Sequence, residues 1–156
     1  MKKLKVLLVD DEQEFVETLA DRLAIRDLQT STAHNGQEAL SAVEKDEPDV
    51  IVLDLKMPGL HGIDVLRRLK QAYPNVEVII LTGHGSQKDE EAARGLGAFD
   101  YLNKPADLET LVSQIRRAFK QRLQTLEKMS MAVAFAEAGE FDTAKKIMEQ
   151  QNKKGD

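Results

Sequence analysis

Five apolar runs of strand length recur within the first 119 residues, and each precedes a segment whose apolar side chains have helical spacing. Strands that alternate with helices in this way form a parallel sheet connected by crossover helices. The second run is more polar than the others, which is typical of a strand at a sheet edge. We predict strands at 4–9, 28–33, 49–55, 76–81 and 98–102, and helices at 12–26, 37–45, 63–73, 86–96 and beyond Asp107, the predicted N-cap.

Five strands and five helices in about 120 residues predict an α/β fold with a doubly wound sheet. Right-handed crossovers and short connections leave few topologies, of which the common one has strand order 2-1-3-4-5. In that order strands 1 and 3 are neighbours, and the chain reverses direction between them. Ligands of such sheets bind in the crevice beyond the carboxyl ends of the strands, so we expect the functional site there.

Polar residues occur at these strand ends. Asp10 and Asp11 follow the first strand, Asp54 the third, Thr82 the fourth and Lys104 the fifth. Neighbouring strands lie about 4.8 Å apart, so the three carboxylates should converge within several ångströms. Their mutual repulsion is tolerable only around a cation, and a hard divalent ion such as Mg²⁺ prefers oxygen ligands. With a hydroxyl and a lysine added, the set favours phosphoryl chemistry on a carboxylate that gives an aspartyl-phosphate.

Each of these residues also has an ordinary structural interpretation. Asp10 and Asp11 could cap the following helix, Thr82 could end a turn, and Lys104 could be a solvated surface lysine. Tyr101 alternates with apolar positions and could belong to the core. A carboxylate that closes an apolar run, as Asp54 does, is costly without a partner. Convergence at one sheet edge therefore favours the functional interpretation.

The ordered set of motifs resembles the receiver domain of bacterial response regulators over residues 4–120. The matching positions are Asp10-Asp11, Asp54 with Met57-Pro58-Gly59 and Gly62, Thr82, Tyr101 and Lys104-Pro105. The resemblance implies a flavodoxin-like doubly wound fold with extra C-terminal helices, and a receiver domain at 1–120. It also implies that Asp54 is the phosphoacceptor, supplied by a sensor histidine kinase or phosphotransfer protein.

The resemblance further assigns roles around the acceptor. Asp11, Asp54 and the backbone carbonyl of Lys56 would hold Mg²⁺, with Asp10 acting mainly through water. Lys104 would pair with the phosphoryl oxygens, and its bond to Pro105 would be cis. Phosphorylation would draw Thr82 toward the phosphate and turn Tyr101 inward.

Two positions beside the acceptor tune hydrolysis of the acyl phosphate in this family, and here they are Lys56 and His84. We expect both bulky side chains to hinder the attacking water and prolong the phosphorylated state. Ala106 is a departure, since the family usually has a larger apolar residue there. The three histidines, His34, His61 and His84, lack the spacing of a helical zinc site and are expected on loops or the surface.

Composition excludes some classes of protein but does not identify the function. The chain has a net charge of −5, no cysteine and no apolar stretch long enough to span a membrane. The charge is −6 over residues 1–119 (15 basic, 21 acidic) and +1 over residues 120–156 (7 basic, 6 acidic). Neither part has the basic excess of a nucleic-acid surface, so we expect no DNA binding and no membrane partner. We expect a cytoplasmic protein.

A helical extension is predicted at 121–156. The segment 106–138 lacks Gly and Pro and keeps an apolar rhythm broken at Arg122, which suits either a homodimer through residues 107–138 or a helix folded back on the domain. Gly139 should end this helix, and 141–151 can form another. Residues 132–150 resemble one tetratricopeptide-type hairpin, but a lone repeat cannot bury its apolar face.

Three functions fit these patterns to different degrees. The favoured one is a signalling module, switched by Mg²⁺-dependent phosphorylation and recognised by a downstream protein. An aspartate-nucleophile phosphatase of the haloacid-dehalogenase type would need an acid two residues after Asp54, where Lys56 stands. A transcription factor with a reduced output segment is the third, although the extension is short for a winged helix.

Overall fold

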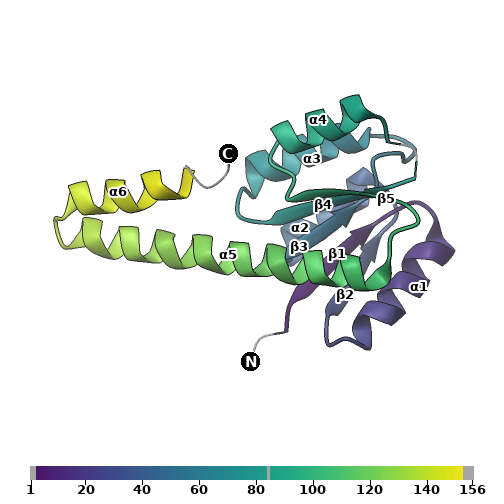
Figure 1. Cartoon of the computed structure of the whole chain (residues 1–156), viewed down its shortest axis with the longest axis horizontal. Coiled ribbons are helices and arrows are strands. Elements are labelled where there is room, and N and C mark those ends of the chain that lie inside the picture. The colour runs from purple at the N-terminus through teal and green to yellow at the C-terminus, as the bar shows by residue number, and fades with distance from the viewer. Residues whose placement is uncertain (1–2, 84, 153–156) are drawn as a thin grey trace. The chain divides into compact units, whose positions relative to one another are not determined.

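The computed structural model describes residues 3–83 and 85–152, with side chains to Gln150. Helices and strands alternate through most of this part (Figure 1). In chain order the elements are β1 Lys5–Val9, α1 Gln13–Ala24, β2 Gln29–Ala33, α2 Gly36–Lys45, β3 Val50–Leu53, α3 Gly62–Ala72, β4 Glu77–Thr82, α4 Gln87–Gly95, β5 Asp100–Asn103, α5 Leu108–Glu137 and α6 Phe141–Asn152.

The strands of the described residues form one five-stranded sheet in which all pairs are parallel, in the order β2-β1-β3-β4-β5. The predicted topology is confirmed, and so is the edge position of β2, whose side chains are mostly exposed. Val9 pairs with both Ala33 and Leu53 at the carboxyl end of the sheet. The residues that follow β1 and β3 are therefore held side by side.

Both faces of the sheet are covered, because successive strand side chains point to opposite faces. Val6 and Leu8 of β1 belong to a core with α1 and the first part of α5, whereas Leu7 and Val9 belong to a core with α2, α3 and α4. Figure 1 shows these two helical layers. A sheet buried on both faces explains why the inner strands are almost wholly apolar.

β5 begins two residues later than predicted, at Asp100. The preceding residues complete the end of α4, since Gly97 has a φ of +97° and the amide of Ala98 donates to the carbonyl of Ala93. The start of α4 has a capping box, in which Ser86 and Asp89 each accept a hydrogen bond from the other's amide. The spacing of apolar residues cannot distinguish the turn at Gly97 and Ala98 from the strand that follows it.

The chain divides into two compact units, Met1–Phe119 and Lys120–Asp156. The second unit contains the rest of α5 and all of α6, joined by a tight turn. Gly139 has a φ of +84°, and the amide of Glu140 donates to the carbonyl of Phe135. This is the usual glycine termination of a helix, and it confirms the predicted stop.

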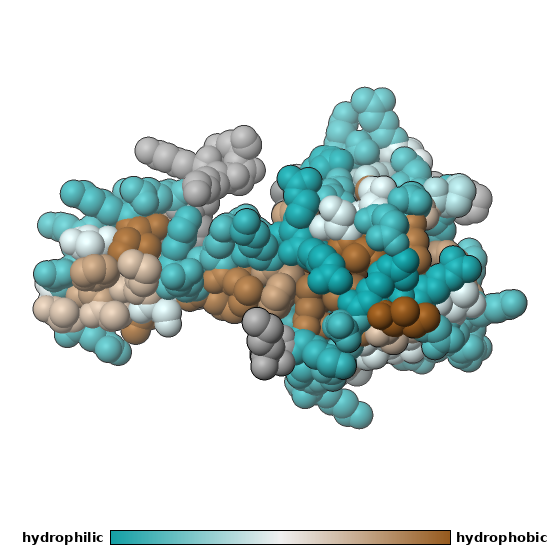
Figure 2. Space-filling view, turned by 60° about the horizontal axis from the view of Figure 1, so that its bottom comes forward, coloured by the Kyte–Doolittle hydropathy of each residue, from teal (hydrophilic) through white to brown (hydrophobic). Residues whose placement is uncertain are grey.

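Within the second unit, Ala132 of α5 and Ala144 of α6 are buried, as expected where two helices pack closely. Apolar side chains remain exposed, including Val133, Phe141 and Met148, and Figure 2 shows apolar patches among hydrophilic ones on this hairpin. None of the helices in the described part of the chain combines the length and apolar character needed to cross a bilayer.

Candidate phosphoryl-transfer site

Backbone hydrogen bonds that continue the sheet fix the acidic residues. The amide of Asp54 donates to the carbonyl of Val9 at 2.9 Å, and the amide of Asp10 donates to that of Ala33 at 3.1 Å. Asp10 and Asp54 are only 4% and 5% exposed, whereas Asp11 is exposed. Each of the three offers a carboxylate oxygen, and these oxygens lie within 4.8 Å of one another. The predicted convergence is confirmed.

Lys104 extends into the same crevice from the end of β5. Its amide donates to the carbonyl of Thr82, and its peptide bond with Pro105 is cis, as the resemblance implies. The ammonium donates a 2.6 Å hydrogen bond to Asp10 and lies 3.5 Å from Asp54 and 3.8 Å from Glu12. A single cation is thus surrounded by three carboxylates, and the Lys104 side chain is only 14% exposed.

Burial and neighbouring charged groups both shift the pKa values of Asp10 and Lys104. Burial raises the pKa of Asp10 and the nearby charge of Asp54 adds to the rise, although hydrogen bonds from Lys104 and the Glu12 amide counteract it. For Lys104, burial alone would lower the pKa, but the hydrogen bond to Asp10 and the charges of Asp10, Asp54 and Glu12 raise it above its ordinary value. The crevice therefore carries an excess of negative charge that favours cations.

These oxygens suit a hard divalent cation. The structure brings together three carboxylates, two of them largely shielded from water, and such sets prefer Mg²⁺ or a similar ion. The Asp54 carboxylate also accepts a 3.3 Å hydrogen bond from the amide of Lys56, which places the backbone of that residue next to the cluster.

Thr82 and Tyr101 lie beside the crevice. Thr82 is fully buried, and Tyr101 is 6% exposed, so its ring already points inward in this structure. Neither hydroxyl has a hydrogen-bond partner among the described residues. Burial raises the pKa of Tyr101, and the negative charges of Asp89, Glu90 and Asp54 raise it further.

The structure also describes most of the other residues that the sequence analysis singled out. Lys56 is exposed two residues after Asp54, whereas His84 lies outside the described residues. His61 is an exposed loop residue whose Nδ1 accepts a hydrogen bond from the amide of Ile63 at the start of α3. His34 lies on the loop after β2 and is partly buried. Ala106 is partly buried and packs against the core shared by β1, α1 and the first part of α5.

Three residues next to the site were not predicted from the sequence. Phe15 places its ring centroid 4.4 Å from the Lys104 ammonium, although its spacing indicated only the apolar face of a helix. Glu12 approaches Lys104 from the start of the same helix. Gly85 lies so close to Tyr101 that a Cβ there would overlap the tyrosine hydroxyl. In the sequence, the one indication that Glu12 borders the site is its position directly after Asp10 and Asp11.

The family profile of the response regulator receiver domain matches residues 6–116, so the chain belongs to that family. Solved structures agree: a response regulator receiver domain protein from Clostridium thermocellum is 36% identical, with a TM-score of 0.73 over 76% of this chain and 96% of that one. The receiver domain of the Francisella response regulator 1452 is 31% identical, with a TM-score of 0.71 over 76% of this chain and 98% of that one.

Longer relatives carry further segments. The C4-dicarboxylate transport transcriptional regulatory protein DctD of Pseudomonas aeruginosa is 35% identical over 137 residues, which is 88% of this chain but 30% of that protein. The response regulator MprA of Mycobacterium tuberculosis is 34% identical over 134 residues, 86% of this chain and 58% of that protein. This chain is thus a receiver-type signalling module of two-component systems, and it spans part of the length of these relatives.

Proposed function

We propose that this chain accepts a phosphoryl group on Asp54 from a sensor histidine kinase or phosphotransfer protein and signals through protein contacts. The observation that carries the proposal is the meeting of Asp10, Asp11 and Asp54 within 4.8 Å, with Lys104 3.5 Å from Asp54. Asp54 is the proposed nucleophile, because its carboxylate lies 3.5 Å from the Lys104 ammonium and accepts a hydrogen bond from the Lys56 amide.

In the proposed transfer, an Asp54 carboxylate oxygen forms a bond to phosphorus while the bond from phosphorus to the donor imidazole breaks. The imidazole leaves with the electron pair and keeps the proton on its other nitrogen. Lys104 moves from Asp10 toward the phosphoryl oxygens, whose charge it stabilises. The chain itself catalyses this step and the slow hydrolysis that reverses the signal, and it is otherwise not an enzyme.

Asp10, Asp11, Asp54 and the backbone carbonyl of Lys56 are the proposed metal ligands. Mg²⁺ bound there supplies positive charge that offsets the carboxylates and stabilises the transferring phosphoryl group. Lys56 and His84 are proposed to slow hydrolysis by hindering the approach of water to the acyl phosphate. Thr82 and Tyr101 are proposed to move on phosphorylation and so to change the surface formed by α4, β5 and α5.

Residues 1–120 are proposed as the receiver domain and 121–156 as its helical extension. The exposed apolar side chains of the extension support a role in contacts with a downstream protein or a second copy of the chain. Sedimentation equilibrium of the full chain and of a chain ending at residue 120 tests the homodimer. A full chain that remains monomeric at high concentration would exclude it.

Phosphorylation by acetyl phosphate with Mg²⁺, followed by mass spectrometry, tests the proposal directly. We expect one phosphoryl group on the peptide that contains Asp54, and none after Asp54→Asn. Asp49, buried directly before β3, is an internal control that should stay unmodified, and Asp64→Asn, at an exposed position on α3, should retain full phosphorylation. An unchanged yield in Asp54→Asn would contradict the proposal.

A further inference from the structure

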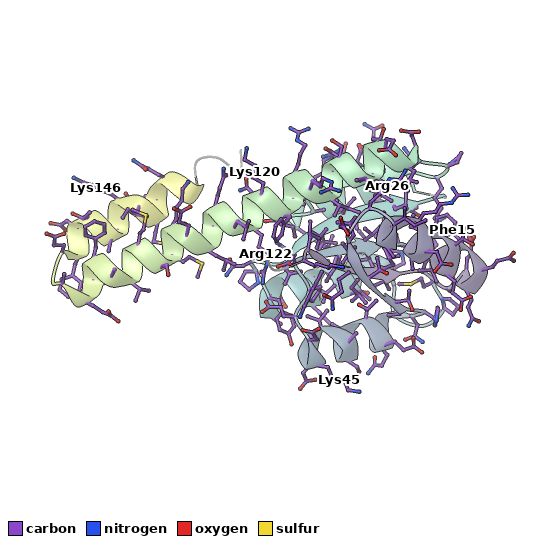
Figure 3. The ribbon with its side chains drawn as sticks, turned by 90° about the horizontal axis from the view of Figure 1, so that it is seen from below. Phe15, Arg26, Lys45, Lys120, Arg122 and Lys146 are labelled. Atoms are coloured by element: carbon purple, nitrogen blue, oxygen red, sulfur yellow. The ribbon has the colours of Figure 1, made fainter. Side chains whose placement is uncertain are left out.

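The ring of Phe15 lies against the Lys104 ammonium, and Phe15 belongs to α1 (Figure 3). The Lys104 Nζ lies 4.4 Å from the ring centroid, within the roughly 6 Å range of a cation–π interaction. Because the Lys104 side chain is only 14% exposed, water screens this attraction weakly. The ring is therefore an electrostatic partner of the lysine as well as a hydrophobic neighbour.

The ring has a property that the carboxylates lack. Asp10 attracts the ammonium and accepts a hydrogen bond from it at 2.6 Å, and Asp54 and Glu12, at 3.5 and 3.8 Å, are carboxylates that can also accept its N–H donors. An aromatic face attracts the positive charge without accepting a conventional hydrogen bond. A lysine held by a ring therefore keeps donors free for an incoming phosphoryl group.

Glu12 is the competing partner. Its side chain is 65% exposed and lies 3.8 Å from the ammonium, whereas Asp54 is buried on the inner side. Lysine has a flexible four-carbon stem, so its ammonium can move between such partners. We expect Phe15 to restrict that movement, because its ring centroid lies 4.4 Å from an ammonium that is hydrogen-bonded to the buried Asp10.

The same side chain also borders two spaces. One is a surface cleft of about 730 Å³ that Phe15 lines with Leu19, Ala106 and Leu111. The other is a void of about 10 Å³ that it lines with Asp10 and Asp54. Its position between an open cleft and the acidic crevice means that removal of the side chain would also admit water. The experiment must therefore separate the charge attraction of the ring from its bulk.

We propose that Phe15 is a positioning residue for phosphoryl transfer: its ring holds the Lys104 ammonium toward Asp54 and away from Glu12. The inference rests on the proposed phosphorylation of Asp54 and adds to it a residue on α1 that acts through Lys104. It predicts that the electron density of the ring, and not only its size, sets the rate of phosphorylation.

Replacement of Phe15 by phenylalanines with one, two and three ring fluorines is the decisive test, since fluorine weakens the attraction for a cation with little change in shape. Loss of a cation–π contact changes an equilibrium by a factor of about 2 to 30. We expect the phosphorylation rate with acetyl phosphate at saturating Mg²⁺ to fall with each fluorine, by about fivefold for three. Phe15→Leu should lose at least as much, and Phe15→Tyr should retain most of the rate.

Two further variants identify the cause. Thr18→Ala changes the same cleft without touching Lys104 and should leave the rate unchanged. In the Phe15→Leu background, Glu12→Gln removes the competing charge and should restore part of the rate. A trifluorinated protein as fast as the wild type would overturn the proposal, because a bulk or water-excluding role would then suffice.

A nuclear magnetic resonance measurement is independent of phosphorylation. The ring current of Phe15 should shift the Cε protons of Lys104 upfield in the wild type, and Phe15→Leu should abolish the shift. Cε protons at an ordinary lysine position in the wild type would overturn the proposal even if Asp54 were phosphorylated. Conversely, an upfield shift in a wild-type protein that acetyl phosphate fails to modify would contradict the proposed function and leave the contact itself established.

Discussion

Gly85 lies against the hydroxyl of Tyr101, in a space that no larger residue can share. A Cβ at position 85 would overlap the tyrosine oxygen and would also lie 2.8 Å from the Cγ2 of Thr82. Real Cβ atoms do not approach other heavy atoms so closely, so the inward position of Tyr101 depends on glycine here. The two side chains expected to act as a switch thus both pack against a residue that has no side chain.

Gly85→Ala should displace Tyr101 outward. Burial and the charges of Asp89, Glu90 and Asp54 raise the pKa of Tyr101 above the ordinary value of 10.0, so an exposed ring should titrate at lower pH. Spectrophotometric titration in a Tyr73→Phe background follows this single tyrosine. Gly83→Ala is the matched control, because its Cβ would meet only Lys104 carbons at 3.7 and 3.8 Å. Identical titrations of the two variants would contradict the coupling.

Asp10 should make stability depend on pH when Mg²⁺ is absent. Burial, aided by Asp54, raises the pKa of Asp10 above its ordinary value of 3.8, so the folded state binds this proton more tightly than the unfolded state. The ionised group therefore destabilises the fold at neutral pH, and this loss is recovered as pH falls through the raised pKa toward 3.8. Asp10→Asn should raise the free energy of unfolding at pH 7.

Urea denaturation across the acidic range measures this difference. The advantage of Asp10→Asn over the wild type should shrink as pH falls and vanish below the unfolded pKa. Asp21→Asn, at an exposed position on α1, controls for the general effect of removing one negative charge. If the difference in the free energy of unfolding between Asp10→Asn and the wild type stayed constant with pH, ionisation of Asp10 would not be its cause.

Mg²⁺ should stabilise the folded chain, because the carboxylates proposed as its ligands converge only in that state. A ligand at a hundredfold excess over its dissociation constant adds about 2.7 kcal/mol to the free energy of unfolding. We expect the midpoint of thermal unfolding to rise with added MgCl₂ and to fall again with EDTA. Asp54→Asn and Asp11→Asn should lose most of this response, whereas Asp64→Asn should keep it. A response that survives in Asp54→Asn would place the ion elsewhere.

Gly62 is required by close packing at the start of α3. A Cβ there would overlap the backbone of Leu55, whose carbonyl accepts a hydrogen bond from the Gly62 amide at 3.0 Å. Since backbone cannot move aside as a side chain can, Gly62→Ala should destabilise the fold by about 1–3 kcal/mol. Gly95→Ala, with no atom within 4 Å of its Cβ, should be neutral or stabilising in the same denaturation experiment.

Lys56→Ala should shorten the life of the phosphorylated state several-fold. The Lys56 side chain is exposed two residues after Asp54, where its bulk is proposed to hinder an attacking water. The half-life of radiolabelled Asp54 phosphate after removal of the donor measures the effect. Lys45→Ala, a surface change on α2, is the control, and an unchanged half-life for Lys56→Ala would remove this role.

Local patterns in the sequence determined the order of the elements and some of their ends. Apolar runs of strand length, the Asp107 cap that accepts a hydrogen bond from the Thr110 amide, and the stop at Gly139 are all readable from neighbouring residues. Polar residues at the ends of predicted parallel strands also indicated the acidic cluster, because parallel strands bring their carboxyl ends to one edge.

Tertiary structure alone decided which side chains contact one another across those elements. Lys104 reaches Asp10 over 94 positions, and whether its ammonium also meets Phe15 depends on how α1 packs beside the end of β5. The apolar spacing of Phe15 gives the same helical pattern whether the ring enters the core or covers a lysine. The spacing of apolar residues indicates which face of one helix or strand is buried. The contacts of Phe15 and Gly85 depend instead on the distances between elements, and those distances are set only by the assembled fold.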